Sequence, residues 1–169
     1  MMSKRASVAA MAFLLCVVEA FGQETKPNFT GEWTLDREKS DLGEPGQGGR
    51  GGRGRGMGLG SFSITHEGNS LVLKRKVEFQ GEERTFESRH STDGKESVNE
   101  GFRGSTVSSK TRWEGPKLVT ESVMETPNGQ RETKEVRSLS ADGKAMTVEI
   151  ISKGGFGEGT RKLVYTKKD

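Results

Sequence analysis

Short stretches of alternating apolar and polar residues follow one another from residue 61 to the end of the chain. Such alternation predicts β-strands with one buried and one exposed face. Turn sequences containing Gly or Asn separate the stretches, and no segment shows the 3.6-residue apolar period of a helix. These stretches lie at 61–65, 71–79, 82–90, 96–102, 106–113, 117–125, 131–139, 145–152 and 160–167, and an earlier strand at 29–35 brings the expected number to about ten consecutive strands.

Ten consecutive antiparallel strands would leave two long unpaired edges if they formed a flat sheet. Closure of the sheet removes these edges, so we expect an all-β domain, an up-and-down antiparallel β-barrel of about 8–10 strands. One hairpin can be assigned a register. A type I turn with a Gly bulge at Ala141-Asp142-Gly143 places Ser140 opposite Lys144 and Val136 opposite Val148.

The first 22 residues differ from the rest, because 16 of them are apolar. Lys4 and Arg5 precede an apolar stretch from Ala6 to Val18, and small residues follow at Ala20 and Gly22. This order is typical of a secretory signal peptide. A helix of 13 residues covers about 20 Å, too little to cross a bilayer of about 30 Å.

We therefore expect residues 1–22 to be removed as a signal peptide, so that the secreted or periplasmic protein begins at Gln23 and spans no membrane. The remaining residues, 23–169, would form one barrel domain. The single cysteine, Cys16, lies in the removed segment, so the mature domain must be stable without disulfides.

The composition favours one small domain with many half-exposed strands. Hydrophobic residues make up 30% of the chain, and a barrel strand needs only one inward apolar face. The 27 Lys and Arg residues nearly balance the 24 Asp and Glu residues. This balance does not call for an anionic macromolecule as partner.

A Gly/Arg-rich segment, residues 43–60, interrupts the strand pattern with ten Gly and three Arg in 18 positions. It has too little apolar surface to pack, which predicts a flexible loop inside the barrel domain. Its Arg spacing is also found in RNA-binding tails, but it lacks the aromatic residues that stack on bases. We favour a solvated insertion and expect no nucleic-acid partner.

The first predicted strand carries a Gly-x-Trp motif at Gly31 and Trp33, within the string FTGEWTLDREKSD. The strand resembles the first strand of lipocalins and fatty-acid-binding proteins. Together with the ending LSADGKAMTVEI…TRKLVYTKK, the string is similar to small secreted bacterial lipocalin-like proteins. The resemblance implies a calycin barrel that binds a small, mainly apolar molecule, with Gly31 and Trp33 as structural residues at one end of the barrel.

The chain departs from these families in two places. Fatty-acid-binding proteins have two helices between the first two strands, where this chain has the Gly/Arg-rich segment, so we expect no helical lid. Their ligand carboxylate is commonly held by an Arg-x-Tyr pair on the last strand. The matching positions here are Leu163 and Tyr165, with Arg161 two residues before Leu163.

Four residues are the candidate ligand-binding positions: Arg75, Thr111, Trp113 and Tyr165. Thr111 and Trp113 share the parity of a partly polar strand face that can line the interior. Arg75 interrupts the apolar face of its strand, so it either meets an internal carboxylate or an acidic ligand, or is turned outward by a bulge. Arg137 is a weaker candidate of the same kind.

Catalytic and metal-binding patterns are poor. The only two histidines, His66 and His90, lie 24 residues apart without metal-ligand spacing, and we expect them at surface positions of strands. The chain contains no nucleophile elbow and no phosphate loop. These observations favour a protein that is not an enzyme and needs no metal or cofactor.

The sequence therefore favours a secreted or periplasmic lipocalin-like binding protein for a small, mainly apolar molecule. The alternative is a structural or protein-interaction barrel with a filled interior. The side chains that could fill it are the large aromatic ones, at Phe62, Phe79, Phe86, Phe102 and Trp113.

Overall fold

The structure, a computed structural model, describes residues 26–42, 60–79, 82–101, 104–126, 129–154 and 158–168. The expected signal peptide and all of the Gly/Arg-rich segment except Gly60 lie outside these residues. The described residues form one ten-stranded antiparallel sheet in the order β4-β3-β2-β1-β10-β9-β8-β7-β6-β5. Its strands are β1 (Gly31–Asp41), β2 (Ser61–Glu67), β3 (Ser70–Phe79), β4 (Glu82–Ser91), β5 (Asp93–Glu100), β6 (Thr106–Glu114), β7 (Lys117–Thr126), β8 (Gly129–Leu139), β9 (Ala145–Gly154) and β10 (Gly159–Lys167).

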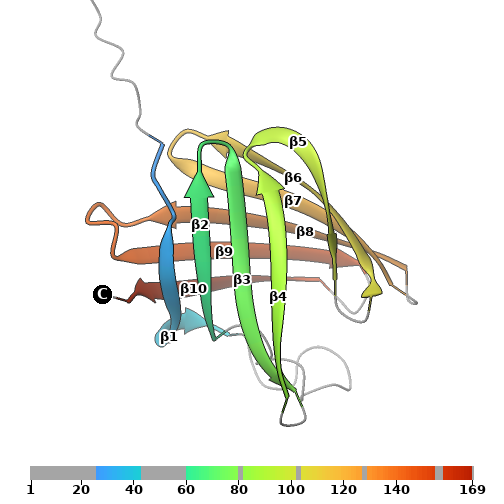
Figure 1. The fold of residues 1–169 in the computed structure, drawn as a ribbon, viewed down its shortest axis with the longest axis horizontal. Helices are drawn as coiled ribbons and strands as arrows, with labels where there is room; N and C mark the ends of the chain where they lie inside the picture. Colours follow the sequence, from blue (N-terminus) through green and yellow to red (C-terminus); the bar gives the residue numbers. More distant parts are fainter. Residues whose placement is uncertain are drawn as a thin grey trace, which may run out of the picture.

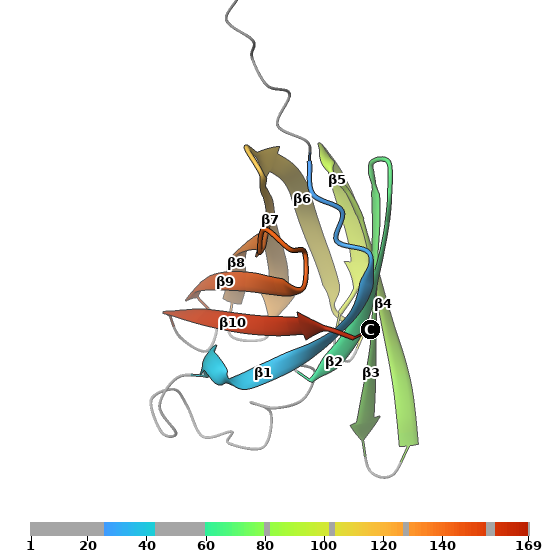
Figure 2. The same cartoon turned by 90° about the vertical axis from the view of Figure 1, so that its left-hand side faces the viewer.

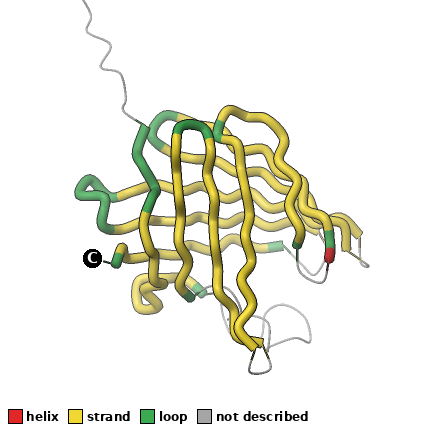
Figure 3. The backbone as a smooth tube through the Cα atoms, in the orientation of Figure 1, coloured by secondary structure: helices red, strands yellow, loops and turns green. Residues whose placement is uncertain are grey.

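The sheet curls into a nearly closed barrel, which confirms the predicted all-β architecture. Strands β1 to β4 run steeply across the direction of β7 to β10 (Figure 1), and the turned view shows the two halves enclosing an interior (Figure 2). β1 joins the halves, because it pairs with β2 on one side and with β10 on the other. Strand dominates the described chain, with one short helical turn at Gly104 (Figure 3).

The hairpin between β8 and β9 corrects the predicted register by one residue. Val136 pairs with Glu149 and not, as predicted, with Val148. Ser140 and Ala145 close the turn, since the Ser140 N–H donates to the Ala145 carbonyl at 2.8 Å. Four residues, 141–144, therefore lie between Ser140 and Ala145, one more than the predicted turn contains.

The wider turn is stabilised by side-chain hydrogen bonds that the apolar–polar pattern of the sequence does not predict. The Asp142 carboxylate accepts hydrogen bonds from the Ser140 hydroxyl at 2.5 Å and from the Lys144 N–H at 3.0 Å. The shift of one residue exchanges the two faces of β8 relative to β9. As a result, Arg137 lies on the inner face of the barrel, and Val136 does not.

Trp33 is buried, and Gly31 lies close to the side chain of Lys167. The Trp33 side chain is fully buried, and its Nε1–H donates to the Phe29 carbonyl at 3.0 Å. The ammonium of Lys167 lies 5.7 Å from the centre of the Trp33 ring. Gly31 has a φ of 152° and lies under the Lys167 side chain, so a Cβ at this position would collide with that side chain.

Candidate ligand-binding interior

The inner face of the barrel is apolar at one end and polar further along. We call the buried hydrophobic cluster the apolar end. Its fully or largely buried members are Phe29, Trp33, Phe62, Ile64, Leu71, Leu73, Leu118, Met146, Val148, Leu163 and Tyr165. Successive side chains of a strand point to opposite faces of the sheet, so residues two positions apart share a face. On β3, β6, β7 and β8, the inner-face positions next to the apolar end carry polar side chains.

Phe29, His66 and Trp113 pack together at the apolar end. The ring of Trp113 stacks on His66 at a centroid distance of 5.8 Å and lies 6.0 Å from Phe29. His66 Nδ1 accepts a hydrogen bond from the Phe29 N–H at 3.5 Å, and burial lowers the pKa of this histidine. Trp113 and Lys26 also line a small hollow of about 170 Å³. Trp113 therefore both packs against these rings and lines the hollow.

A cluster of charged and hydroxyl groups adjoins the apolar end and shares Tyr165 with it. We call Arg75, Glu135, Arg137 and Tyr165 the interior arginine cluster. Arg137 is buried, forms an ion pair with Glu135 and donates from Nη1 to the Thr120 hydroxyl at 3.2 Å. Its Nε–H has no hydrogen-bond acceptor among the described residues.

Arg75 faces the interior, and no bulge turns it outward. The pairing of β2, β3 and β4 continues without a shift past Arg75, which is opposite Phe62 on one side and Phe86 on the other. Its guanidinium lies 5.4 Å from the centre of the Phe62 ring, and Phe62 in turn contacts Tyr165 edge-on at 4.8 Å. The Nε–H of Arg75 is buried and also lacks an acceptor within the described part of the chain.

The charges of the cluster act on its neighbours. Burial is the largest effect on the pKa of Tyr165 and raises it. Of the charged neighbours, Arg75 and Arg137 lower this pKa, and Glu135 raises it. Burial, and after it the positive charge of Arg137, lower the pKa of His90 to about 4, while the carboxylate of Glu135 opposes this shift. Near neutral pH both Tyr165 and His90 are therefore uncharged. Two guanidiniums against one carboxylate leave the cluster with one net positive charge.

Thr111 belongs to the same polar network through hydroxyl groups. Its side chain is 1% exposed and hydrogen-bonds the Thr120 hydroxyl at 3.0 Å, and Thr120 accepts from Arg137. The structure thus brings three of the four predicted positions, Arg75, Thr111 and Tyr165, to one polar region. It places Trp113 at the apolar end.

His66 and His90 are not surface residues, contrary to the expectation. Both are opposite Leu71, whose side chain is fully buried, so all three side chains share the inner face. His90 Nδ1 lies 3.1 Å from the Ser109 hydroxyl across the barrel wall. Sequence alternation gives the parity of a residue without showing which face is inside, so the sequence alone does not predict that these two histidines face the interior.

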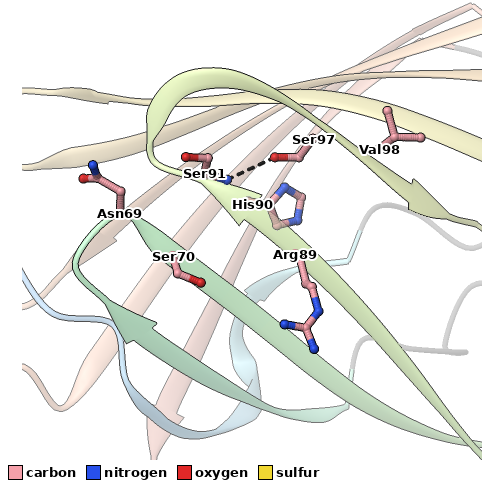
Figure 4. A pocket seen from close by; sticks show the side chains of 7 residues that line it. All are labelled: Asn69, Ser70, Arg89, His90, Ser91, Ser97 and Val98. Carbon is pink, nitrogen blue, oxygen red and sulfur yellow. Dashed lines mark hydrogen bonds between the residues drawn. The ribbon is translucent and has the colours of Figure 1, made fainter.

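β4 and β5 are the first and last strands in the order of the sheet. Hydrogen bonds of side chains link these two strands. The Asn99 amide accepts from the Arg89 N–H at 2.7 Å and donates to the Arg89 carbonyl at 3.0 Å. The Ser97 hydroxyl accepts from the Ser91 N–H at 3.0 Å (Figure 4). A hollow of about 500 Å³ follows this seam, lined by Asn69, Ser70, Arg89, His90, Ser91, Ser97 and Val98.

Sequence reasoning missed Glu135 and Thr120, which hold Arg137 in place. Glu135 lies two residues before Arg137 on β8, so their side chains share one face of the strand. Thr120 of β7 pairs with Glu135, and Leu118 of β7 pairs with Arg137. Within the described residues, no group of three or more His, Cys, Asp or Glu side chains is placed to hold a metal ion. No helix in the described part of the chain is long and apolar enough to cross a membrane.

The antiparallel ten-stranded barrel with a partly polar interior has the fold of the fatty-acid-binding and lipocalin-like calycin proteins. Among solved structures, it is similar to a REP1-NXSQ fatty acid transporter, with a TM-score of 0.58 and 14% identity over 83% of this chain and 96% of that chain. Lipid binding protein 8 of Caenorhabditis elegans gives a TM-score of 0.57 and 13% identity over 83% and 95% of the two chains.

The ileal bile acid-binding protein of zebrafish, in complex with cholic acid, gives a TM-score of 0.54 and 16% identity over 83% of this chain and 98% of that chain. At these identities the likeness establishes the fold. No protein-family model matches the chain, and no curated protein matches it.

Proposed function

We propose that the barrel binds a small, mainly apolar molecule with an acidic group, and that this group is held by the interior arginine cluster. The observation that carries the proposal is the pair of buried Nε–H donors on Arg75 and Arg137 that no described residue accepts. Buried polar groups are nearly always hydrogen-bonded, and a buried guanidinium is costly without an acceptor. A ligand carboxylate would supply acceptors and compensate the net positive charge.

The surroundings of the cluster suit an amphipathic ligand. The buried hydrophobic residues of the apolar end contact the cluster through Phe62 and Tyr165, so one molecule could lie against both. The uncharged Tyr165 hydroxyl can donate to an anion, because burial raises its pKa. Pockets for small molecules combine mainly apolar walls with a few placed polar groups, which is the composition of this interior.

The similar structures support the same ligand class. By their names, one neighbour is a fatty acid transporter and another is a bile acid-binding protein, and both ligands are acids with large apolar parts. In the present chain the last strand offers Tyr165 but has Leu163 where the Arg of the Arg-x-Tyr pair would be. We propose that Arg137 on β8 and Arg75 on β3 provide the cationic groups instead.

We also propose that the protein acts outside the cytoplasm. The support is the order of charged, apolar and small residues within 1–22. N-terminal sequencing of exported protein should begin at Gln23. Exported protein that still begins at Met1 would overturn this part of the proposal.

Displacement of an apolar fluorescent dye tests ligand binding. We expect the protein lacking residues 1–22 to bind the dye saturably, and dodecanoate to displace it at about tenfold lower concentration than 1-dodecanol. A hydrogen bond to a charged group contributes about 1.5–3 kcal/mol, and 1.4 kcal/mol corresponds to a factor of ten. The acid and the alcohol have the same apolar chain, so their ratio isolates the acidic group.

The variant Arg75→Met keeps an unbranched side chain over Phe62 and removes the charge. It should weaken dodecanoate binding by about tenfold and leave 1-dodecanol unchanged. The control is Arg112→Met, on the outer face of β6, where Arg112 pairs with Glu114 and Glu121. Failure of the folded protein to bind dye, acid or alcohol would overturn the proposal and favour the filled, structural barrel.

A further inference from the structure

The first half of β4 is exposed on both faces and along one edge. Residues 82–87 of this strand are all exposed, although alternate residues of a barrel strand normally face a buried interior. β4 is at one end of the sheet order, and β3 is its ladder partner among the described residues. In both ribbon views the start of β4 extends beyond β5 (Figures 1 and 2). We call the side of residues 82–88 that faces away from β3 the open edge.

The backbone groups at the open edge can be assigned from the seam with β5. The N–H and the carbonyl of Arg89 both point away from β3, since the Asn99 amide bonds them at 2.7 and 3.0 Å. Backbone groups of alternate residues point to the same side of a strand, and β4 pairs with β3 without a bulge. The N–H and carbonyl groups of Glu83, Thr85 and Glu87 therefore point to the open edge. Within the described part of the chain, these groups have no hydrogen-bond partner.

The charges at the open edge are complementary to a second copy of the same strand. Charged side chains often protect an edge strand from pairing, but the order of the charges decides whether they do so. An antiparallel pair of β4 strands centred on Phe86 would put Glu83 of each copy opposite Arg89 of the other. Opposite charges directly across two strands stabilise the pair, and like charges destabilise it. A pair centred on Thr85 would put Glu83 opposite Glu87, so the charges favour the register centred on Phe86.

Phe86 supplies an apolar contact at the centre of this register. Its side chain is 37% exposed, which is unusual for a large hydrophobic residue of the described chain. Its backbone groups point to β3, so it would face its own copy in a non-hydrogen-bonded pair, where side chains come closest. Phe86 also lies opposite Arg75 of β3. The two Phe86 rings would therefore meet on the inner face, beside the interior arginine cluster.

From the open edge and its self-complementary side chains we propose that two copies of this chain dimerise through β4. Thr85 of each copy would exchange backbone hydrogen bonds with Glu87 of the other, and the pairs of Glu83 with Arg89 would flank this ladder. The ladder ends at Arg89, whose backbone is already bonded to Asn99. So short a contact predicts a weak dimer that depends on protein concentration. The inference is independent of ligand binding and goes beyond the proposed function.

Sedimentation velocity of the chain from residue 23 onward tests this inference. We expect the fraction of dimer to rise with protein concentration. Thr85→Pro removes a donor at the open edge and keeps the ladder with β3, because proline is tolerated where the N–H of an edge strand faces solvent. It should raise the dissociation constant of the dimer about tenfold, since each copy loses an interstrand hydrogen bond. The matched control, Thr85→Val, retains the N–H and should leave this constant within about twofold.

Charge reversal tests the register. Glu83→Arg, or Arg89→Glu, puts like charges opposite each other and should weaken the dimer about tenfold. The double variant restores opposite charges and should recover the dimer. Arg84→Glu is the matched control, because Arg84 lies opposite Ser88 in this register, and it should change the dissociation constant by less than about twofold. A monomer at every concentration, or a dimer that Thr85→Pro or the single reversals leave unchanged, would overturn the inference and leave the proposed ligand binding intact.

Discussion

Replacement of Trp33 by Ala should lower the free energy of unfolding by about 3–5 kcal/mol, the usual range for removal of a buried aromatic side chain. Trp33 is fully buried, donates a hydrogen bond to the Phe29 carbonyl and supports the Lys167 side chain. Its loss would leave a cavity at the apolar end and an unpaired carbonyl. Domains of this size are stable by about 5–15 kcal/mol, so much of the total would be lost.

Urea unfolding followed by circular dichroism measures this loss. Val98→Ala is the control, because Val98 is 64% exposed and its truncation should change stability by less than about 0.5 kcal/mol. A loss below about 1 kcal/mol for Trp33→Ala would show that the apolar end is not packed as described.

Acidification should destabilise the barrel before its carboxylates titrate, and His90 should be a main cause. Burial and the neighbouring Arg137 lower the pKa of His90 from 6.5 to about 4 in the folded state. The unfolded chain therefore binds the proton first as the pH falls. Stability is full above about pH 6.5 and is lost progressively down to pH 4. The loss would be of the order of 3 kcal/mol, since one pKa unit corresponds to about 1.4 kcal/mol.

Urea unfolding at several pH values between 7 and 4 measures this effect. His90→Gln retains a group that can hydrogen-bond Ser109 but cannot titrate, so its stability should change much less over the same window. His66 also has a pKa lowered by burial and supplies a part of the slope that remains in the variant. If His90→Gln keeps the full pH dependence, His90 is not buried beside Arg137.

The sequence predicts the fold well because barrel strands repeat a simple pattern. Alternation and Gly-containing turns predict ten strands, which the structure contains, and the Trp33 of the Gly-x-Trp motif is fully buried. The register of the β8–β9 hairpin is harder to predict. The hydrogen bonds of Asp142 and Ser140 decide the turn, and a change of one residue exchanges the faces of the strand.

The site is only partly visible in the sequence for the same reason. Parity predicts that Arg75 and Tyr165 can face the interior, and the structure brings them together through Phe62. The partners of Arg137 come from its own strand and from β7, and they can be assigned only when the correct register is known. Parity alone does not show that His90 lies on the inner face, where its pairing partner Leu71 is fully buried.

We propose that an acidic ligand group lies between Arg75 and Arg137 inside the barrel. Carbon-13 NMR of dodecanoate labelled at its carboxyl carbon tests this most directly. With the protein from residue 23 onward, we predict a separate bound resonance that stays at the ionised position from about pH 7 to pH 5. Two guanidiniums would hold the pKa of the bound acid below its value in water. The absence of a bound resonance, or a bound carboxyl that titrates like the free acid, would contradict the claim.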